Sequence, residues 1–577
     1  MMERNNLMRI AFYGANRVAK DFYYVLKDTD MEVSLCFADA SEDAAGFAQG
    51  TGIETVPVAS LPALRANFDM LVVCDFSHEE KEQTLQAMGL AHGKEYQWVE
   101  EIFPLFDDVQ LNPEEKPMLV WGCGRKGEQF YRWNTAYEVE AYLDRAPQGE
   151  AFYGYPCRKP ETVQDWSRYF IVVAVARNEA ICDFLEQQGC KRYRDFCTYE
   201  DIESLPSTLL RQTILQPEVY DFTCRSMLNH AEIGGRGNVI CCCSTFIRNS
   251  LGDISEERSF RDCWNSFVHR ILCLSNVNRT YSFCLHDMCP LFIGRHETRD
   301  YHLSKPYPKM EDAPRTVAVG FDYTCNLKCV TCRKDFRVAK EEDKRQIQSI
   351  AEMVRDQVLP GCEFLIMAGD GEVLLSDAYR TVYASEQMKH IRWFRLLTNG
   401  LLFTPEKWAE LRRYTDAKIM MTVSIDAATP ETYANIRRGG MFAVLERNMA
   451  YASQLRKIGE LSYLRFNFVV QRQNFQEMIP FVEWGKRLGV DELFFTKILN
   501  WGTYSREEFR DISMMEENGI TPKPELQAVL DQPIMRDPIV DLGTIRYQHD
   551  GTDTETVENY YRWELERKVP DLFGEGK

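Results

Sequence analysis

The sequence has no long hydrophobic run and no excess of positive charge. No stretch of the 577 residues approaches the roughly 18 apolar residues of a transmembrane helix, so we expect no membrane partner. The chain opens with MMERNNLMRIAFYGANRVAK, which has no apolar secretory core and predicts a cytoplasmic protein. The formal net charge of -19 leaves no dominant basic face, so no nucleic-acid partner is expected.

The sequence also lacks any segment biased enough in composition to be disordered. It is 45% hydrophobic and 27% charged, as in ordinary globular proteins, and its length asks for several domains. Its 19 cysteines are unevenly placed along the chain. Only one of them, Cys362, follows Cys332. In a long chain without a secretory signal, such cysteines are read as metal ligands and buried thiols.

Two glycine turns, RIAFYGANRVAK and MLVWGCGRKGEQF, mark a weak internal repeat. Each copy alternates apolar strands with helical segments, which predicts two small Rossmann-like domains at 1–110 and 111–205. The second copy has the dinucleotide-binding glycines, with an acid about 20 residues on: Gly122, Gly124, Gly127 and Asp144. These turns either bind a nucleotide or only allow close packing of strand and helix. The two domains are similar to N-terminal modules of sugar-modifying acyltransferases.

Residues 306–500 return to a strong alternation of strand and helix. Six apolar strands are expected: RTVAVGF, EFLIMAG, WFRLLTN, KIMMTVSID, LRFNFVV and ELFFTK. This α/β pattern predicts a partial (β/α)6 barrel with its active site at the carboxyl ends of the strands. Residues 206–305 form a Cys-rich module before the barrel, and 501–577 an extension that packs on it.

Three cysteines follow the first strand of this barrel with C-x3-C-x2-C spacing: Cys325, Cys329 and Cys332. Thiolates are natural ligands of iron–sulfur clusters, and three on one loop can hold three irons of a 4Fe-4S cluster and leave the fourth open. A structural zinc site would need a fourth ligand, and Cys362 lies thirty residues away.

This loop closely resembles the cluster motif of the radical S-adenosylmethionine (radical SAM) superfamily. The resemblance implies that S-adenosylmethionine chelates the open iron and is cleaved to methionine and a 5'-deoxyadenosyl radical, which abstracts hydrogen from a substrate. It also implies a flavodoxin-like or ferredoxin-like reductant.

The ends of the next three strands resemble other motifs of the same superfamily. The resemblance implies cofactor contacts by Gly369, Gly371, Glu372, Asn399, Ser424 and Asp426. Taken singly, each is an ordinary turn or helix cap. The sequence departs from the family at Thr331, where many members have an aromatic residue against adenine, and Phe336 is the substitute we consider.

The Cys-rich segments GNVICCCSTF and YSFCLHDMCP resemble a SPASM-type auxiliary cluster module, although such modules usually follow the barrel. The resemblance implies a second 4Fe-4S cluster on Cys224, Cys242, Cys284 and Cys289. Cys241 and Cys243 compete with Cys242, and a zinc on the same four sulfurs is the alternative. Cys263 and Cys273 fall in helix-like surroundings and are expected to be buried.

The sequence indicates the class of substrate only through the domains that precede the barrel. The tandem Rossmann-like domains favour a carbohydrate or nucleotide-sugar, oxidised or epimerised, over a peptide or protein. Alternatives are a peptide-modifying maturase, an iron–sulfur electron-transfer protein without enzymatic activity, and a nicotinamide dehydrogenase as a second activity. No catalytic hydrogen donor or base and no oligomeric state is predicted.

Overall fold

The computed structural model divides the chain into two compact units. One is Met1–Val219 with Asp300–Tyr307, and the other is Tyr220–Arg299 with Pro308–Lys577. The structure describes residues 8–27, 31–75, 78–107, 109–134, 138–175, 178–216, 219–220, 224, 226–244, 246–247, 249–286, 289, 292, 313–332, 339–368, 370–499, 504, 506–517, 519 and 521–546.

The first unit contains two separate sheets. The first sheet is entirely parallel, in the order β3-β2-β1-β4-β5. Its strands are β1 (Met8–Tyr13), β2 (Met31–Ala38), β3 (Thr55–Pro57), β4 (Met70–Val73) and β5 (Gln97–Trp98), and its helices α1 (Arg17–Leu26), α2 (Ala44–Thr51), α3 (Leu61–Leu64), α4 (His78–Ala87) and α5 (Val99–Ile102). The Asn16 side chain caps α1 by accepting from the Ala19 N–H, so the helix starts directly after the glycine turn.

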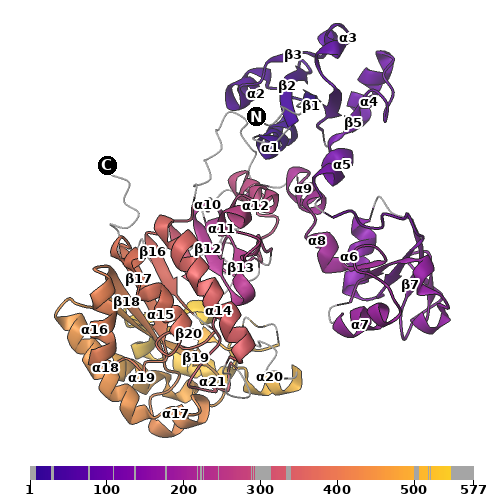
Figure 1. Cartoon of the computed structure of the whole chain (residues 1–577). Helices are drawn as coiled ribbons and strands as arrows, with labels where there is room; N and C mark the ends of the chain where they lie inside the picture. The colour runs from indigo at the N-terminus through magenta and orange to yellow at the C-terminus, as the bar shows by residue number, and fades with distance from the viewer. Residues whose placement is uncertain are drawn as a thin grey trace. The chain divides into compact units, whose positions relative to one another are not determined.

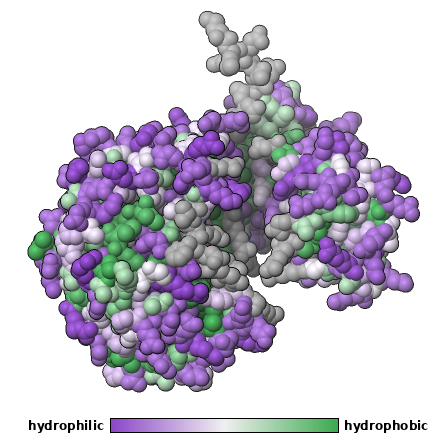
Figure 2. All heavy atoms as spheres, turned by 60° about the horizontal axis from the view of Figure 1, so that its bottom comes forward, coloured by the Kyte–Doolittle hydropathy of each residue, from purple (hydrophilic) through white to green (hydrophobic). Residues whose placement is uncertain are grey.

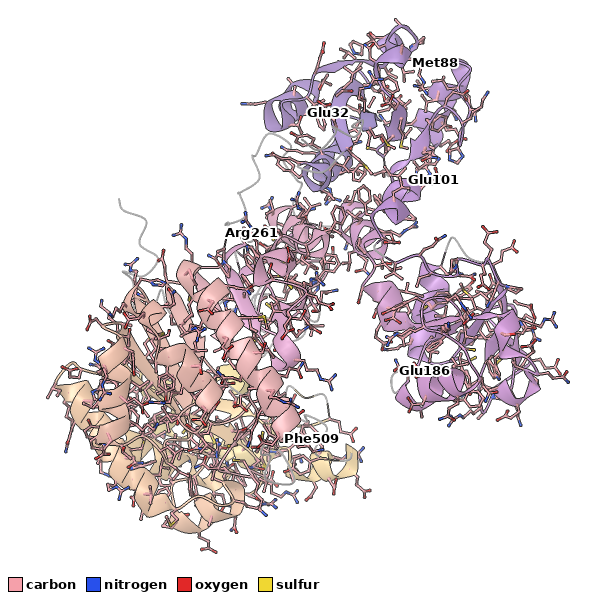
Figure 3. The ribbon with its side chains drawn as sticks, viewed as in Figure 1. Glu32, Met88, Glu101, Glu186, Arg261 and Phe509 are labelled. Atoms are coloured by element: carbon pink, nitrogen blue, oxygen red, sulfur yellow. The ribbon has the colours of Figure 1, made fainter. Side chains whose placement is uncertain are left out.

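The second sheet has the order β11-β10-β6-β7-β9-β8 and is parallel except for the β8–β9 hairpin at its edge. Its strands are β6 (Met118–Trp121), β7 (Val139–Leu143), β8 (Ala151–Phe152), β9 (Tyr155–Arg158), β10 (Phe170–Val173) and β11 (Phe196–Thr198). Helices α6 (Arg125–Trp133), α7 (Glu179–Gln187), α8 (Tyr199–Glu203) and α9 (Pro206–Ile214) accompany it. In Figure 3, Glu32 on β2 and Glu186 on α7 locate the two sheets.

The second unit is built on one sheet, which has ten strands within the described residues. The order is β14-β13-β12-β15-β16-β17-β18-β19-β20-β21, and all pairs from β12 to β21 are parallel. The six strands expected from the sequence are β15 (Thr316–Val319), β16 (Phe364–Met367), β17 (Trp393–Thr398), β18 (Lys418–Ser424), β19 (Tyr463–Val470) and β20 (Glu492–Lys497). The α/β class and the parallel order of these six strands are thereby confirmed.

Short strands from both neighbouring segments extend this sheet at its two edges. The Cys-rich segment adds β12 (His230–Ile233), β13 (Asn238–Ile240) and β14 (Gly252–Asp253), and the C-terminal segment adds β21 (Val540–Asp541). The Cys-rich segment also holds helices α10 (Ser226–Asn229), α11 (Phe260–Trp264) and α12 (Phe267–Val277). The five-part division of the chain stays a prediction.

Helices connect the parallel strands in the predicted alternation. They are α14 (Glu341–Met353), α15 (Asp377–Tyr383), α16 (Pro405–Tyr414), α17 (Pro430–Ile436), α18 (Phe442–Lys457) and α19 (Met478–Leu488), followed by α20 (Arg506–Ile512), α21 (Pro524–Leu530) and α22 (Gly543–Arg546). Figure 1 shows α16, α18 and α19 along the outside of the strands. Thr404 accepts from the Lys407 N–H at the start of α16, with proline next, as the sequence predicts.

The described helices include none that combines the length and apolar character needed to cross a membrane. The face in Figure 2 is mostly hydrophilic, with hydrophobic groups in scattered patches, as expected for a chain with a net charge of -19.

Candidate functional site

The cysteine loop follows β15 at the carboxyl end of the parallel strands. Cys325 is half-buried, Cys329 is 7% exposed and Cys332 is exposed. The segment after α17 holds the loop through two backbone hydrogen bonds, Lys328 N–H to Arg438 O at 3.0 Å and Val330 N–H to Ile436 O at 3.0 Å. The loop is therefore held in place by the strand-end segments around it.

The next strand end packs directly against this loop. Gly371 has no room for a side chain, because a Cβ there would lie 2.3 Å from the Thr324 carbonyl oxygen. The Glu372 N–H donates to the same oxygen at 2.8 Å. The turn after β16 thus touches the residue that precedes Cys325, and this contact requires glycine.

Glu372 is 1% exposed and joins this turn to the next strand end. Its carboxylate accepts from the Thr398 hydroxyl at 2.7 Å, the Asn399 N–H at 2.8 Å and the Leu374 N–H at 3.1 Å. Burial raises the pKa of Glu372, while these hydrogen bonds act against the shift. The Asn399 side chain in turn donates to Asn326, inside the cysteine loop, at 2.8 Å.

The two residues predicted at the end of β18, Ser424 and Asp426, differ in burial and in hydrogen bonding. Ser424 is half-buried, and its hydroxyl has no partner within the described part of the chain. Asp426 is fully buried, with φ of 64°, a conformation that non-glycine residues adopt rarely. Its carboxylate accepts from the Val469 N–H at 2.7 Å and pairs with Arg437 at 2.6 Å. Burial raises the pKa of Asp426, and Arg437 opposes that rise.

Arg437 is a site residue that sequence reasoning missed. One guanidinium nitrogen pairs with Asp426, and another donates to the Cys329 sulfur at 3.5 Å. Burial raises the pKa of the Cys329 thiol, and the nearby guanidinium counteracts this. A cation at this position favours the thiolate that binds iron.

The residues of this loop fit an iron–sulfur cluster. Three sulfurs on one loop supply three soft ligands, and the bare backbone at Gly371 lies against the loop. Among the described residues, no three His, Cys, Asp or Glu side chains are already gathered as a metal site. Gly369 and Phe336, both considered from the sequence, lie outside the described residues.

The cysteines assigned to an auxiliary cluster share one neighbourhood. Cys224, Cys284 and Cys289 pack against Tyr281 and Phe292. Burial, and then the nearby thiols of Cys224, Cys243, Cys284 and Cys289, raise the pKa of Cys242.

The other cysteines of this region have different surroundings. Cys241 is fully buried, and Cys243 is a hydrogen-bonding neighbour of Glu232. Cys263 and Cys273 are buried in α11 and α12, as the sequence predicts. Cys241 also lies near Cys224 and Cys284, so the choice of Cys242 among the three consecutive cysteines stays a prediction.

Polar side chains are buried on the last three strands of the large sheet, near the amino-terminal ends of β19 and β20. Arg465 on β19 is 2% exposed and donates to Asn467 at 2.9 Å. Glu492 on β20 accepts from the Tyr463 hydroxyl at 2.5 Å and lies 3.7 Å from Arg465. Burial, and then Glu492, raise the pKa of Asp541 on β21. These ionisable groups lie near the amino-terminal ends of β19 and β20, at the opposite end of the parallel strands from the cysteine loop.

A hollow of about 580 Å³ adjoins the cysteine loop on the outside. Its lining consists of Val330, Thr432, Ala434, Asn435, Arg438 and Gln473. The hollow brings solvent and small molecules close to the backbone of the loop.

In each of the two glycine turns of the first unit, a carboxylate of the chain accepts a hydrogen bond from a backbone N–H of the turn. In the first turn, Glu42 accepts from the Ala15 N–H at 3.1 Å and also pairs with the buried Lys81 at 2.8 Å. In the second turn, Asp144 accepts from the Cys123 N–H at 3.2 Å. Gly122 and Gly127 are needed for packing, but a Cβ at Gly124 would meet nothing within 4 Å.

Comparison with known proteins identifies relatives of the second unit. Residues 321–512 match the model of the radical SAM superfamily. A probable GTP 3',8-cyclase of Methanococcus maripaludis strain C5 is 25% identical over 176 residues, which are 30% of this chain and 56% of that protein. The GTP 3',8-cyclase of Limosilactobacillus fermentum is 24% identical over 195 residues, 33% of this chain and 57% of that protein. The chain thus spans just over half the length of these curated relatives.

Solved structures resemble about a third of the chain. Streptococcus suis SuiB bound to S-adenosylmethionine is 16% identical, with 35% of this chain and 43% of that chain covered and a TM-score of 0.26. The structure of anSMEcpe with bound AdoMet and Kp18Cys peptide is 19% identical, with 32% and 51% covered and a TM-score of 0.24.

Proposed function

Because residues 321–512 form a domain of the radical SAM superfamily, we propose that this chain is an enzyme that cleaves S-adenosylmethionine reductively and abstracts hydrogen from a substrate. The observation that carries the proposal is the convergence of two strand ends, those of β16 and β17, on one loop. Gly371 and Glu372 touch the Thr324 carbonyl, and Asn399 bonds Asn326. The family uses a 4Fe-4S cluster and S-adenosylmethionine, so these contacts would surround both.

In this proposal the side chains hold, orient and shield the reacting groups. Cys325, Cys329 and Cys332 would bind three irons, with Arg437 stabilising the Cys329 thiolate. When bound, the cluster supplies the electron that splits S-adenosylmethionine into methionine and the 5'-deoxyadenosyl radical. The Ser424 hydroxyl is free to bind this ligand. Asp426 would act through Arg437, because its carboxylate is already engaged.

We place the substrate at the carboxyl ends of the parallel strands, next to the cysteine loop. The two Rossmann-like domains expected at 1–110 and 111–205 favour a carbohydrate or nucleotide-sugar over a peptide, with oxidation or epimerisation as the outcome. Cys224, Cys242, Cys284 and Cys289 would hold the auxiliary cluster, and a flavodoxin-like or ferredoxin-like protein would supply electrons.

The experiment that tests this function is an anaerobic assay of the full chain. Protein reconstituted with iron and sulfide receives dithionite and S-adenosylmethionine, and 5'-deoxyadenosine is measured by chromatography. We expect about eight irons per chain, two 4Fe-4S clusters, and product formation that the Cys329→Ala variant loses. About four irons with full activity would remove the auxiliary cluster, and a fully loaded protein that releases no 5'-deoxyadenosine would contradict the proposed reaction.

A further inference from the structure

Two half-exposed thiols meet at the glycine turn of the second sheet. The Cys123 and Cys157 sulfurs lie 3.4 Å apart, although 34 residues separate them in the chain. Cys123 stands between Gly122 and Gly124 after β6, and Cys157 lies on β9. Neither cysteine belongs to the groups that we assign to clusters.

The backbone on both sides of this thiol pair is fixed. Asp144 accepts from the Cys123 N–H at 3.2 Å and from the Ala146 N–H at 2.8 Å. The Cys157 N–H donates to Glu150 O at 2.8 Å, and the Asp144 N–H donates to Arg158 O at 3.0 Å. The turn and β9 are therefore connected through Asp144, and the two sulfurs need only a small movement to reach the roughly 2.0 Å of a disulfide bond.

The position of the pair also distinguishes it from ordinary buried cysteines. Cys197, on β11 of the same sheet, is fully buried in the hydrophobic core of that sheet. Cys123 and Cys157 lie at the margin of this core and are partly open to solvent. Next to them, Gly124 faces open space. A small reagent can therefore reach the two sulfurs while the fold stays intact.

We propose that Cys123 and Cys157 form a thiol–disulfide exchange site whose substrates are low-molecular-weight disulfides. One thiolate attacks a disulfide RSSR, forming a mixed disulfide and releasing RS⁻, which takes up a proton. The second thiol then displaces the remaining RS⁻, and the Cys123–Cys157 bond forms. Two protein thiols are oxidised, RSSR is reduced to two RSH, and the two thiol protons leave on these products.

The bond would fix the glycine turn to the β8–β9 edge of the sheet. Any ligand that approaches Gly124 would then meet a covalently closed turn instead of two separate segments. Burial raises the pKa of Cys123, and its hydrogen bond with Cys157 adds to the rise. Since the thiolate is the attacking form, we expect exchange to be faster at pH 9 than at pH 7.

The test uses oxidised glutathione on the anaerobically purified full chain, followed by alkylation of the remaining thiols, trypsin digestion and mass spectrometry. The expected result is a disulfide between the peptide 146–158 and the peptide that ends at Arg125, in protein that stays monomeric on a non-reducing gel. Cys123→Ser and Cys157→Ser should abolish this linked peptide. Cys182→Ser, which alters another half-buried cysteine, on α7 beside the same sheet, should retain the linked peptide.

Two results would overturn the proposal. One is recovery of Cys123 and Cys157 as unreacted thiols under conditions in which the half-buried Cys182 becomes glutathionylated. The other is a stable mixed disulfide on either residue without the internal bond. Neither result depends on the radical reaction, so the proposal for this thiol pair and the proposed enzymatic function are tested separately.

Discussion

Replacing Arg437 by methionine tests whether the buried pair at the cysteine loop is built as described. Methionine keeps an extended apolar side chain but removes the guanidinium. The fully buried Asp426 carboxylate would keep only the Val469 N–H, 2.7 Å away, and lose its partner at 2.6 Å. Leaving one member of a buried ion pair uncompensated costs about 3–5 kcal/mol of unfolding free energy.

This cost corresponds to a measurable fall in the melting temperature of the second unit. At about 2.1 cal/mol/K per residue, about 1 kcal/mol shifts the midpoint of a unit of roughly 350 residues by about 1.4 °C, so Arg437→Met should melt roughly 5 °C lower. The double variant Asp426→Asn/Arg437→Met should recover most of the loss, because no charge is left buried and the amide oxygen still accepts from Val469.

The deficit of Arg437→Met should also depend on pH. Burial already raises the pKa of Asp426, and loss of the guanidinium raises it further. The destabilisation is therefore full above this raised pKa, where the carboxylate is charged, and shrinks as the pH falls and the group becomes protonated. The variant should lie closer to the wild type at pH 5 than at pH 8.

The assay is hydrogen exchange by mass spectrometry on metal-free protein, followed in the peptides of β18 and β19, alongside thermal melting. Metal-free protein separates the ion pair from any effect of the cluster. Arg438→Met is the matched control, because Arg438 is the exposed neighbour and its loss should leave exchange unchanged. A double variant as unstable as Arg437→Met, or a single variant equal to the wild type, would refute the reasoning.

Three further predictions concern other buried contacts. Gly371→Ala places a Cβ 2.3 Å from the Thr324 carbonyl oxygen, so iron bound after reconstitution should fall by about four atoms per chain. In Glu372→Gln an amide NH₂ must face one of three N–H or O–H donors, so unfolding should require about 1–3 kcal/mol less, measured by denaturant melting. Lys81→Met leaves two partly exposed carboxylates at 2.7 and 2.8 Å without their cation, and hydrogen exchange in the first sheet should show a loss of about 1–3 kcal/mol.

Control variants distinguish these predicted losses from unspecific effects of substitution. Gly124→Ala adds a Cβ that meets nothing within 4 Å and should keep the full iron content. Lys94→Met removes an exposed lysine of the first unit and should leave hydrogen exchange unchanged. Equal losses in a variant and its control would remove support for the corresponding contact.

The sequence was sufficient to predict the main sheet because its signals are local. The six apolar strands alternate with helices, and the three cysteines follow the first strand. The edge strands β12, β13, β14 and β21 could not be predicted, since their sequences HAEI, NVI, GD and VD mix polar and apolar residues without an apolar run and depend on pairing with distant segments.

Arg437 was missed because its importance arises from contacts distant in the chain. It lies 108 residues from Cys329, and the sequence around it has no spacing that marks a ligand. A signal was present in Asp426: an acid directly after a buried strand needs a donor or a cation, and the nearby arginines were candidates. The hydrogen bonds of Glu42 and Asp144 to the two glycine turns could not be predicted either. Such turns have similar sequences whether or not they bind a ligand.

The central claim is that Cys325, Cys329 and Cys332 hold a cluster with one iron open to S-adenosylmethionine. Electron paramagnetic resonance of the reconstituted, dithionite-reduced chain tests it directly when Cys224 and Cys284 are both replaced by serine to remove the proposed auxiliary cluster. We expect one reduced 4Fe-4S signal that changes when S-adenosylmethionine is added. A signal that is unaffected by S-adenosylmethionine, or that survives Cys329→Ala in the same background, would contradict it.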